Sequence, residues 1–324
     1  MAKIKITPLA FESMGVRSMC TLVETKDLKV LVDPGVSVAP RFSLMPHPEE
    51  YAARNNSRLK MRKAAEKADV VTISHYHYDH HTPNYVDTVW CGSSPEEAKS
   101  ICGGKLVLAK NTKSHVNTSQ RRRGWLFQKI SGKFVDRFES ADGRSFKLHE
   151  TELRFSDPVY HGEEGSELGW VIMLVVQYGK EKVVHTSDVQ GPSSKKTLEM
   201  ILSEDPDLVI VGGQPLYLSG SKVPVSVIEQ GFQNLQRMVR SVPVTILDHH
   251  IVRSEDWRIQ VKKVFEEAER HGNQVLTAAE YVGKESMPLE SMRKSLYESE
   301  PPSPEFMKWT TMPEMERKKT VPPL

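Results

Sequence analysis

The sequence predicts an α/β protein in which two packed β-sheets are covered by helices on both outer faces. Short runs rich in β-branched residues alternate with longer stretches whose apolar residues recur at helical spacing. Histidine and aspartate side chains come directly after several of the short runs, where strand ends are expected to open onto a cleft. Together these observations favour layered sheets with a polar site along one edge.

The composition is that of a folded protein with one large domain and appendages: 324 residues, 38% hydrophobic and 27% charged. A net charge of +2 and a pI near 8.3 neither require nor exclude a nucleic-acid partner. Three cysteines suit a reducing cytoplasm, with free thiols expected at Cys20, Cys91 and Cys102 unless the last two pair. Because no run approaches a membrane span and the start lacks a signal-peptide core, we expect a cytoplasmic protein without a membrane partner.

The first part of the chain predicts a meander at the edge of a sheet, with strands at residues 3–11, 18–24 and 28–32. The third strand ends at Asp33, before a Pro-Gly pair. This position lets the carboxylate reach into a cleft, although a plain turn aspartate is the alternative. Residues 47–68 then predict a helix whose buried stripe consists of Met61, Ala64, Ala65 and Ala68.

The densest cluster of metal-binding side chains follows a β-branched run at residues 70–73. Alternate side chains of an extended segment point the same way, so the cluster can converge on one point. Imidazole together with carboxylate suits Zn²⁺, and Fe and Mn also accept mixed nitrogen and oxygen ligands. Surface or core histidines are the alternative, but a strand that runs into four such side chains favours a metal site. The four are His75, His77, Asp79 and His80.

The segment from His75 to His80 reads H-x-H-x-D-H, and with it the chain resembles the metallo-β-lactamase superfamily of dinuclear metallohydrolases. The resemblance implies a four-layer αββα sandwich of two mixed β-sheets flanked by helices. It also implies that Asp33 orients a ligand histidine rather than binding metal.

The resemblance extends to ligands further along the chain. His161 lies in a glycine-bounded loop, and Asp188 follows a strand. Asp188 could instead be only a turn former, and His185 is an alternative ligand. A last histidine is supplied by His249 or His250, of which the spacing to Arg253 favours His249. The implied first metal is held by His75, His77 and His161, the second by Asp79, His80 and His249 or His250, and Asp188 bridges them.

The implied chemistry is hydrolysis by a hydroxide that two Zn²⁺ ions, or Fe or Mn, activate between them, with Asp79 also taking a proton. The chain lacks the cysteine ligand of lactam-cleaving members, and His77 stands where oxygen-reducing diiron relatives have glutamate. Too few residues separate Asp188 from His249 for the inserted domain of large nucleases. A compact phosphoester, thioester or lactone hydrolase of an archaeal branch remains, and a diiron redox protein or a non-catalytic binding protein is the alternative from another class.

The rest of the chain predicts further elements and a domain division. The hydrolase domain is expected at residues 1–285, with 110–140 as a basic, less regular insertion and 286–324 as a C-terminal extension. Strands are expected at residues 106–108, 145–149, 151–156, 170–177, 182–188, 207–213 and 242–247. Helices are expected at residues 84–90, from 94, at 194–203, at 225–239 and as one long helix at 254–271, with Ile259, Val261, Val264 and Phe265 available for the core.

The basic segment contributes the prediction about substrate. Arg121, Arg122 and Arg123 lie beside Trp125, and cations next to an aromatic ring can bind phosphate and stack on a base. The alternative is a solvated helix face with Trp125 and Phe127 in the core. We therefore expect a phosphodiester substrate, a nucleotide or another small molecule, ahead of a thioester or lactone. Nucleic acid stays open as a partner, and the sequence does not determine the oligomeric state.

Overall fold

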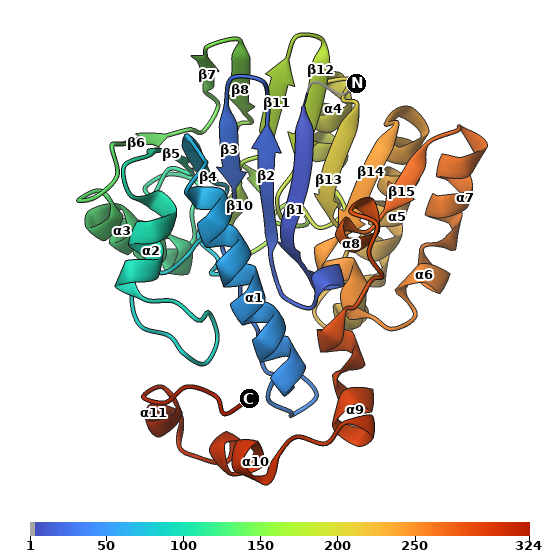
Figure 1. Cartoon of the computed structure of the whole chain (residues 1–324). Helices are drawn as coiled ribbons and strands as arrows, with labels where there is room; N and C mark the ends of the chain where they lie inside the picture. The colour runs from blue at the N-terminus through green and yellow to red at the C-terminus, as the bar shows by residue number, and fades with distance from the viewer. Residues whose placement is uncertain (1–3) are drawn as a thin grey trace.

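The computed structural model describes residues 4–324, which form two large mixed sheets stacked face to face (Figure 1). The first sheet has the order β1-β2-β3-β4-β5-β6. Its strands are β1 (Lys5–Phe11), β2 (Met19–Glu24), β3 (Lys29–Val32), β4 (Val70–Ile73), β5 (Leu106–Ala109) and β6 (Arg137–Ser140). β1, β2 and β3 form the predicted antiparallel meander at one edge, and β3 to β6 run parallel.

The second sheet has the order β15-β14-β13-β12-β11-β8-β7. Its strands are β7 (Ser145–Leu148), β8 (Thr151–Phe155), β11 (Leu174–Tyr178), β12 (Glu181–His185), β13 (Leu208–Gly212), β14 (Val244–Asp248) and β15 (Gln274–Leu276). β12 to β15 are parallel, whereas β7, β8 and β11 add antiparallel strands. A separate short pair joins β9 (Val159–Tyr160) to β10 (Trp170–Val171).

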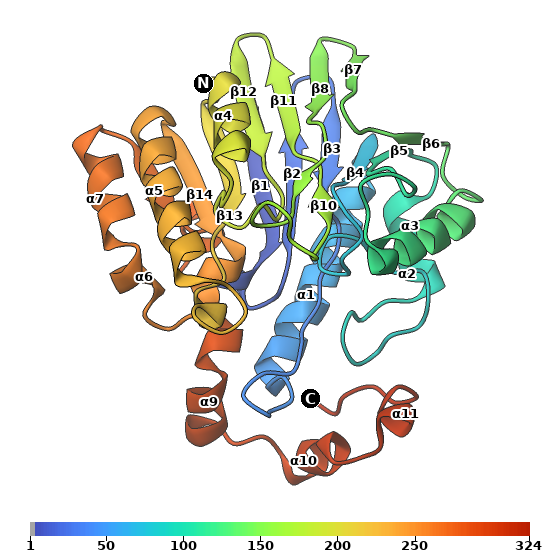
Figure 2. The ribbon, with the colours of Figure 1, turned by 180° about the vertical axis from the view of Figure 1, so that it is seen from behind.

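Helices cover the outer face of each sheet, as Figures 1 and 2 show from opposite sides. The first sheet is covered by α1 (Pro48–Ala65), α2 (Pro95–Cys102) and α3 (Thr118–Ser131). The second is covered by α4 (Lys195–Ser203), α5 (Val225–Ser241) and α7 (Lys262–Arg270), with α6 (Trp257–Gln260) and α8 (Ala278–Tyr281) at its edge. The predicted four-layer sandwich is therefore confirmed.

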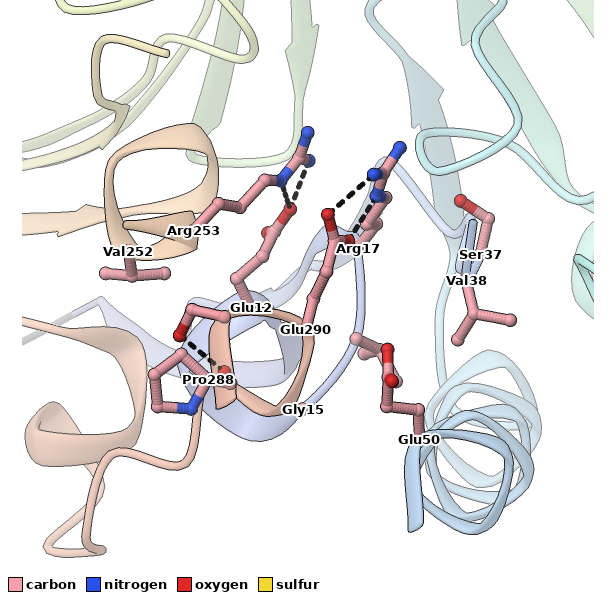
Figure 3. A pocket seen from close by; sticks show the side chains of 12 residues that line it. Glu12, Gly15, Arg17, Ser37, Val38, Glu50, Val252, Arg253, Pro288 and Glu290 are labelled. Carbon is pink, nitrogen blue, oxygen red and sulfur yellow. Dashed lines mark hydrogen bonds and ion pairs between the residues drawn. The ribbon is translucent and has the colours of Figure 1, made fainter. Parts of the chain in front are cut away.

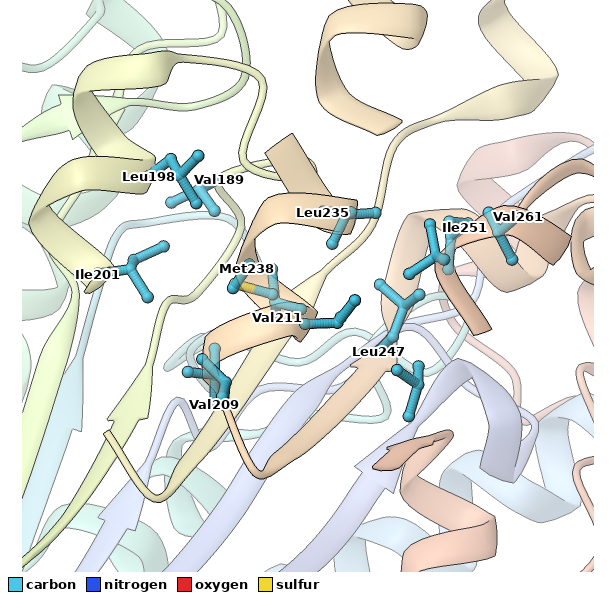
Figure 4. Packing of buried hydrophobic residues seen from close by; sticks show 14 of the residues in the cluster. Val189, Leu198, Ile201, Val209, Val211, Leu235, Met238, Leu247, Ile251 and Val261 are labelled. Carbon is cyan, nitrogen blue, oxygen red and sulfur yellow. The ribbon is translucent and has the colours of Figure 1, made fainter. Parts of the chain in front are cut away.

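Three apolar clusters hold these layers together. One lies between the sheets and joins β1, β2 and β3 to β8, β11 and β12, because each strand directs alternate residues inward. A second packs α1, α2 and α3 on the first sheet, including the predicted stripe of α1. The third, shown in Figure 4, packs α4 and α5 on the second sheet through residues such as Leu198, Val209, Leu235 and Met238.

Several helix starts follow from the local sequence. At α1, the His47 side chain accepts a hydrogen bond from the Glu49 N–H, and the Glu50 carboxylate accepts one from the His47 N–H. Ser94 caps α2, and Asn117 caps α3 by accepting from the Gln120 N–H at 2.8 Å. These caps fix where each helix leaves its loop.

The C-terminal part of the chain lies along the end of α1 (Figure 1) and consists of α9 (Leu289–Ser299), α10 (Pro304–Thr310) and α11 (Glu314–Arg317). Arg293 is fully buried and forms a two-point ion pair with Glu50, with N···O distances of 2.7 and 2.8 Å. Phe306 and Trp309 pack edge-on against Tyr51. The tail is thus anchored to α1 by both charge and aromatic packing.

Some expected elements differ from the structure. Residues 84–90 are not a helix but part of a loop closed by a bridge between Asp87 and Ser93. The predicted helix at 254–271 is divided into α6 and α7 at Val261, and Ile259 is 77% exposed rather than in the core. The run 170–177 is divided into β10 and β11.

Residues 110–140 are more regular than expected, because α3 and β6 connect them into the first sheet. The three cysteines are buried and unpaired, as predicted. Among residues 4–324, no helix is both long enough and apolar enough to cross a membrane.

Candidate metal centre

The side chains predicted as metal ligands meet in two groups at one end of the sheets. The His161 group brings the ligand atoms of four residues within 4.8 Å of one another, and the His249 group does the same with three. The His161 group is His75, His77, His161 and Asp188; the His249 group is Asp79, His80 and His249. Asp188 also lies within the same limit of His249 and His250, so it stands between the two groups.

Each predicted ligand follows the carboxyl end of a strand. The His75 to His80 motif comes after β4, His161 after β9, Asp188 after β12 and His249 after β14. β4 and β14 belong to different sheets, so the stacking of the two sheets brings the His75 to His80 motif close to His249. Open α/β sheets generally present their binding sites at this end of the strands.

The backbone around the centre is unusual. Asp33, Ser187, Gln190 and His249 have φ values of 46°, 56°, 50° and 62°, a left-handed conformation that costs a non-glycine residue free energy and recurs at functional sites. Gly35 allows the closest approach, because a Cβ there would stand 2.5 Å from the His80 amide nitrogen and closer still to that of the next residue. The metal motif can pack on this turn only if the residue is glycine.

Buried polar atoms without partners show that the residues fit a metal ion. Three imidazole nitrogens and one carboxylate oxygen are inaccessible and form no hydrogen bond within the described chain: His75 Nε2, His80 Nε2, His161 Nε2 and Asp188 Oδ1. His161 Nε2 lies 2.8 Å from Asp188 Oδ2 but is not aligned for a hydrogen bond. Since each such atom costs about 1–3 kcal/mol when unsatisfied, converging nitrogens and oxygens of this kind suit a shared cation.

Carboxylates support two histidines of the His249 group from behind. Asp33 Oδ2 accepts a hydrogen bond from His80 Nδ1 at 2.9 Å, and Glu12 Oε2 accepts one from His249 Nδ1 at 2.7 Å. Burial opposes the charged form of both rings, but the carboxylates outweigh it, and the pKa of each ring is raised. With Nδ1 committed as donor, Nε2 of each ring is left to face the centre.

Asp33 was expected to orient a histidine, whereas Glu12 was not predicted at all. Glu12 comes directly after β1, just as Asp33 comes directly after β3. An acidic residue at the end of a buried strand was therefore the signal available for it. Its partner, however, is 237 residues away in the sequence.

Hydroxyl and amide groups support the His161 group. Ser74 Oγ donates to Asp33 Oδ2 at 2.6 Å and lies 3.0 Å from His75 Nδ1, so a serine stands between that histidine and the carboxylate. The Gln190 amide lies 3.3 Å from His161 Nδ1. Burial lowers the pKa of His75 well below its usual range and that of His77 to about 3, which keeps both rings in the neutral form that binds metal.

His249 and His250 differ in what they contact. Arg253 Nη1 donates to Tyr217 Oη at 2.9 Å, so the tyrosine hydroxyl is free to donate to His250 Nδ1, 3.0 Å away. His250 Nε2 then carries a proton toward Asp188 Oδ2, at 3.0 Å. This arrangement makes His250 a hydrogen-bond donor to Asp188. His249 is backed by Glu12 instead, and its Nε2 lies 3.3 Å from Asp188 Oδ2 and 3.9 Å from Asp79 Oδ2.

The centre opens into a cleft of about 890 Å³ whose floor includes Asp79, His161, Asp188 and His250. Burial would raise the pKa of Asp79, but His80 and His249 lower it well below its usual range. Asp79 is therefore ionised, and its side chain remains 18% exposed. Of the two carboxylates among the proposed ligands, Asp79 is the more exposed, because the Asp188 side chain is only 2% exposed.

The structure separates the three arginines that were predicted to act together. Arg123 lines the cleft and lies over the ring of Tyr78 at 4.4 Å, whereas Arg121 and Arg122 line a different groove. Trp125 is 52% exposed, so of the two aromatics proposed for the core only Phe127 is buried. Two other cations that line the cleft, Arg17 and Lys318, were not predicted, and Arg253 was given no role there.

Comparisons with known proteins agree with this architecture. A family model described as "Beta-lactamase superfamily domain" matches residues 16–230. A UPF0282 protein of Methanopyrus kandleri is 44% identical over 90% of this chain and 99% of its own length, and one of Thermococcus gammatolerans is 42% identical over 92% and 96%. The metallo-beta-lactamase fold protein YhfI of Bacillus subtilis has a similar fold, with a TM-score of 0.53 at 18% identity over 87% of this chain and 97% of that one.

Proposed function

This chain belongs to the beta-lactamase superfamily and, within it, to the UPF0282 proteins of archaea, and from this membership we propose that it is a two-metal hydrolase of phosphodiesters. Its membership makes it a hydrolase that binds divalent metal; the number of ions and the substrate are our proposal. The observation that carries the proposal is the set of buried, partnerless ligand atoms in two groups that share Asp188.

In the proposed centre, the His161 group would hold one ion and the His249 group the other, and Asp188 lies close enough to both groups to serve either ion. Zn²⁺ suits these nitrogen and oxygen ligands best, and Fe or Mn would also be accepted. When bound, such ions supply Lewis acidity and lower the pKa of water held between them.

The remaining steps fall to the side chains. Asp79, ionised and open to the cleft, takes the proton of the attacking water. His250, held as a donor by Tyr217, keeps Asp188 oriented in the shared position. Asp33 and Glu12 hold His80 and His249 in the tautomer that presents Nε2.

A phosphodiester is our first choice of substrate because of the charge along the cleft. Arg17, Arg123, Arg253 and Lys318 line it, so a negatively charged small molecule or nucleotide would be attracted to the centre. A thioester or lactone is the second candidate, because Val86, Trp90 and Leu168 on the same lining offer apolar surface to an acyl group.

We further propose that residues 1–285 form the hydrolase domain and that 286–324 are an extension of it. The ion pair between Arg293 and Glu50 supports this division, since it ties the extension to α1 without adding a strand to either sheet.

The test is hydrolysis of a substrate panel by metal-loaded protein. The panel contains bis(p-nitrophenyl) phosphate, a cyclic nucleotide, an acyl thioester and a lactone, each measured with and without chelator. We expect turnover of a phosphodiester that chelation abolishes. Turnover of thioesters or lactones without turnover of phosphodiesters would contradict the substrate class and leave the hydrolase in place.

A further inference from the structure

Two arginines line the cleft beside the proposed metal ligands, and only Arg253 enters the steps above, through its hydrogen bond to Tyr217. Arg17 follows η1 (Glu12–Met14), which comes after β1, and Arg253 ends η3 (His249–Arg253), which comes after β14. The two arginines are therefore supplied by different sheets. In Figure 3 their guanidinium groups point in the same direction, away from Glu50. Both residues line the large cleft.

Buried carboxylates hold this pair in place. Arg17 Nε and Nη2 donate to the two oxygens of Glu290 at 2.6 and 2.7 Å, a two-point pairing that fixes the plane of the guanidinium group. Arg253 Nε donates to Glu12 Oε1 at 2.7 Å, and its Nη1 donates to the Tyr217 hydroxyl at 2.9 Å. Neither arginine therefore has to be ordered when a ligand arrives.

The local charge is not balanced. A third arginine, Arg41, lies 3.5 Å from Glu290 and donates to the Arg253 carbonyl oxygen at 2.6 Å. Three guanidinium groups thus share the two carboxylates Glu12 and Glu290, and Glu12 is also used by His249. Among these five side chains, positive charge therefore exceeds negative charge by one.

The three side-chain nitrogens of Arg253 all donate to Glu12 or Tyr217, and this side chain is 3% exposed, so the donor left for a ligand belongs to Arg17. Within residues 4–324, Arg17 Nη1 forms no hydrogen bond to the protein, and the Arg17 side chain is 22% exposed. Behind the pair lies a cavity of only about 10 Å³, room for about one water molecule. The open cleft of about 890 Å³, which Arg17 also lines, has room for a larger anion.

We propose that Arg17, with the positive charge of Arg253 beside it, forms an oxyanion subsite that binds a carboxylate or phosphate group carried by the substrate beside the bond to be cleaved. This inference rests on the proposed function and deepens it, because it requires a substrate with an anionic group besides the one that reacts. A free guanidinium N–H group binds such oxyanions through charge-assisted hydrogen bonds. A simple neutral lactone or an unsubstituted thioester would leave the subsite unused.

The test is titration calorimetry with inorganic phosphate as the probe, on metal-loaded protein and again after removal of metal with EDTA. The variant is Arg17→Gln combined with Glu290→Gln, which deletes the cation without leaving a buried carboxylate unpaired and without changing net charge. Its matched control is Arg237→Gln combined with Glu199→Gln, a two-point arginine–glutamate pair on the outer helices α4 and α5.

Saturable phosphate binding should be at least about tenfold weaker in the Arg17 double variant and unchanged in the Arg237 control, with and without metal. Arg17→Lys retains the ion pair and the fold, and its phosphate affinity should fall several-fold. This second variant keeps the test decisive if the double variant is unstable. Equal affinity in wild type and all Arg17 variants, or an equal loss in the Arg237 control, would overturn the subsite. Because the titration needs no turnover, failure of the proposed hydrolysis would be seen separately.

Discussion

The two groups of proposed ligands differ in what stands behind their histidines. In the His249 group, His80 and His249 each donate directly to a buried carboxylate, Asp33 and Glu12. In the His161 group, His75 reaches Asp33 only through the hydroxyl groups of Ser74 and Ser187, and His161 contacts an amide. A carboxylate partner makes an imidazole a stronger ligand, so the His249 group relies on charge, whereas the His161 group relies on four converging side chains.

This difference predicts unequal responses when the supporting residues are changed. Loss of a carboxylate behind the His249 group should weaken metal binding strongly, because it removes charge from a buried site. Loss of a neutral partner behind the His161 group should weaken it little. The substitutions below test this contrast in order of expected effect.

The largest effect is expected from Asp79→Ala, which removes a ligand of the His249 group together with the proposed proton acceptor. Hydrolysis should fall at least about 100-fold. Elemental analysis of the same variant should show that the metal of the His249 group is lost and that of the His161 group retained. An active Asp79→Ala protein with full metal content would show that this group has neither role.

Glu12→Gln and Asp33→Asn come next and test the carboxylates directly. Each should lower metal affinity at the His249 group roughly 10- to 100-fold, measured by competition with a chromogenic chelator. Asp33→Asn should also disturb His75 through Ser74, so we expect it to be the more harmful of the two. Wild-type affinity in both variants would remove the contrast between the groups.

Gly35→Ala should have an intermediate effect that begins in the His249 group. The added methyl group would meet the backbone of His80, which cannot move without displacing its ring. We expect a loss of roughly 1–3 kcal/mol in the free energy of unfolding, measured by urea denaturation. Lower metal occupancy should accompany it, and a variant with unchanged stability would show that the turn has more room than the structure indicates.

The smallest effect is expected from Gln190→Ala, in the His161 group. A neutral hydrogen bond contributes about 1 kcal/mol, so metal affinity should fall about fivefold or less. Chelator competition under the conditions used for Glu12→Gln gives the comparison. A loss as large as that in Glu12→Gln would mean that the two groups are supported to the same degree.

The ligands of the His75 to His80 motif could be found from the sequence because their signal is local, whereas His161, Asp188 and His249 were assigned from the resemblance to the superfamily. All of these ligands follow short apolar strands, and the His75 to His80 motif spans only six residues. Glu12 was missed because its role depends on a contact between the ends of β1 and β14, which lie in different sheets. Sequence distance hides such a pair even when the strand-end signal is present.

The errors also have physical causes. Consecutive residues of a helix point about 100° apart, so Arg121, Arg122 and Arg123 cannot all face one cleft. At residues 84–90, Asp87 accepts hydrogen bonds from the N–H groups of Val89 and Trp90, which replaces helical bonding by a side-chain turn.

Most of the predicted helix at 254–271 is helical, in α6 and α7, but the assignment of Ile259 to the core was wrong. The buried stripe of this segment is Trp257, Val261 and Val264, at i, i+4 and i+7. Ile259 lies off that stripe and faces solvent, although its apolar character suggested the core.

The central claim is that two ligand groups sharing Asp188 each hold a metal ion, and metal stoichiometry tests it most directly. Protein purified without chelator and then equilibrated with Zn²⁺ should contain two ions per chain by elemental analysis. Glu12→Gln should retain one tightly bound ion when challenged with a chelator that leaves both in the wild type. Absence of bound metal after purification and no uptake from solution, or a single ion in the wild type under saturating conditions, would contradict the two-metal centre.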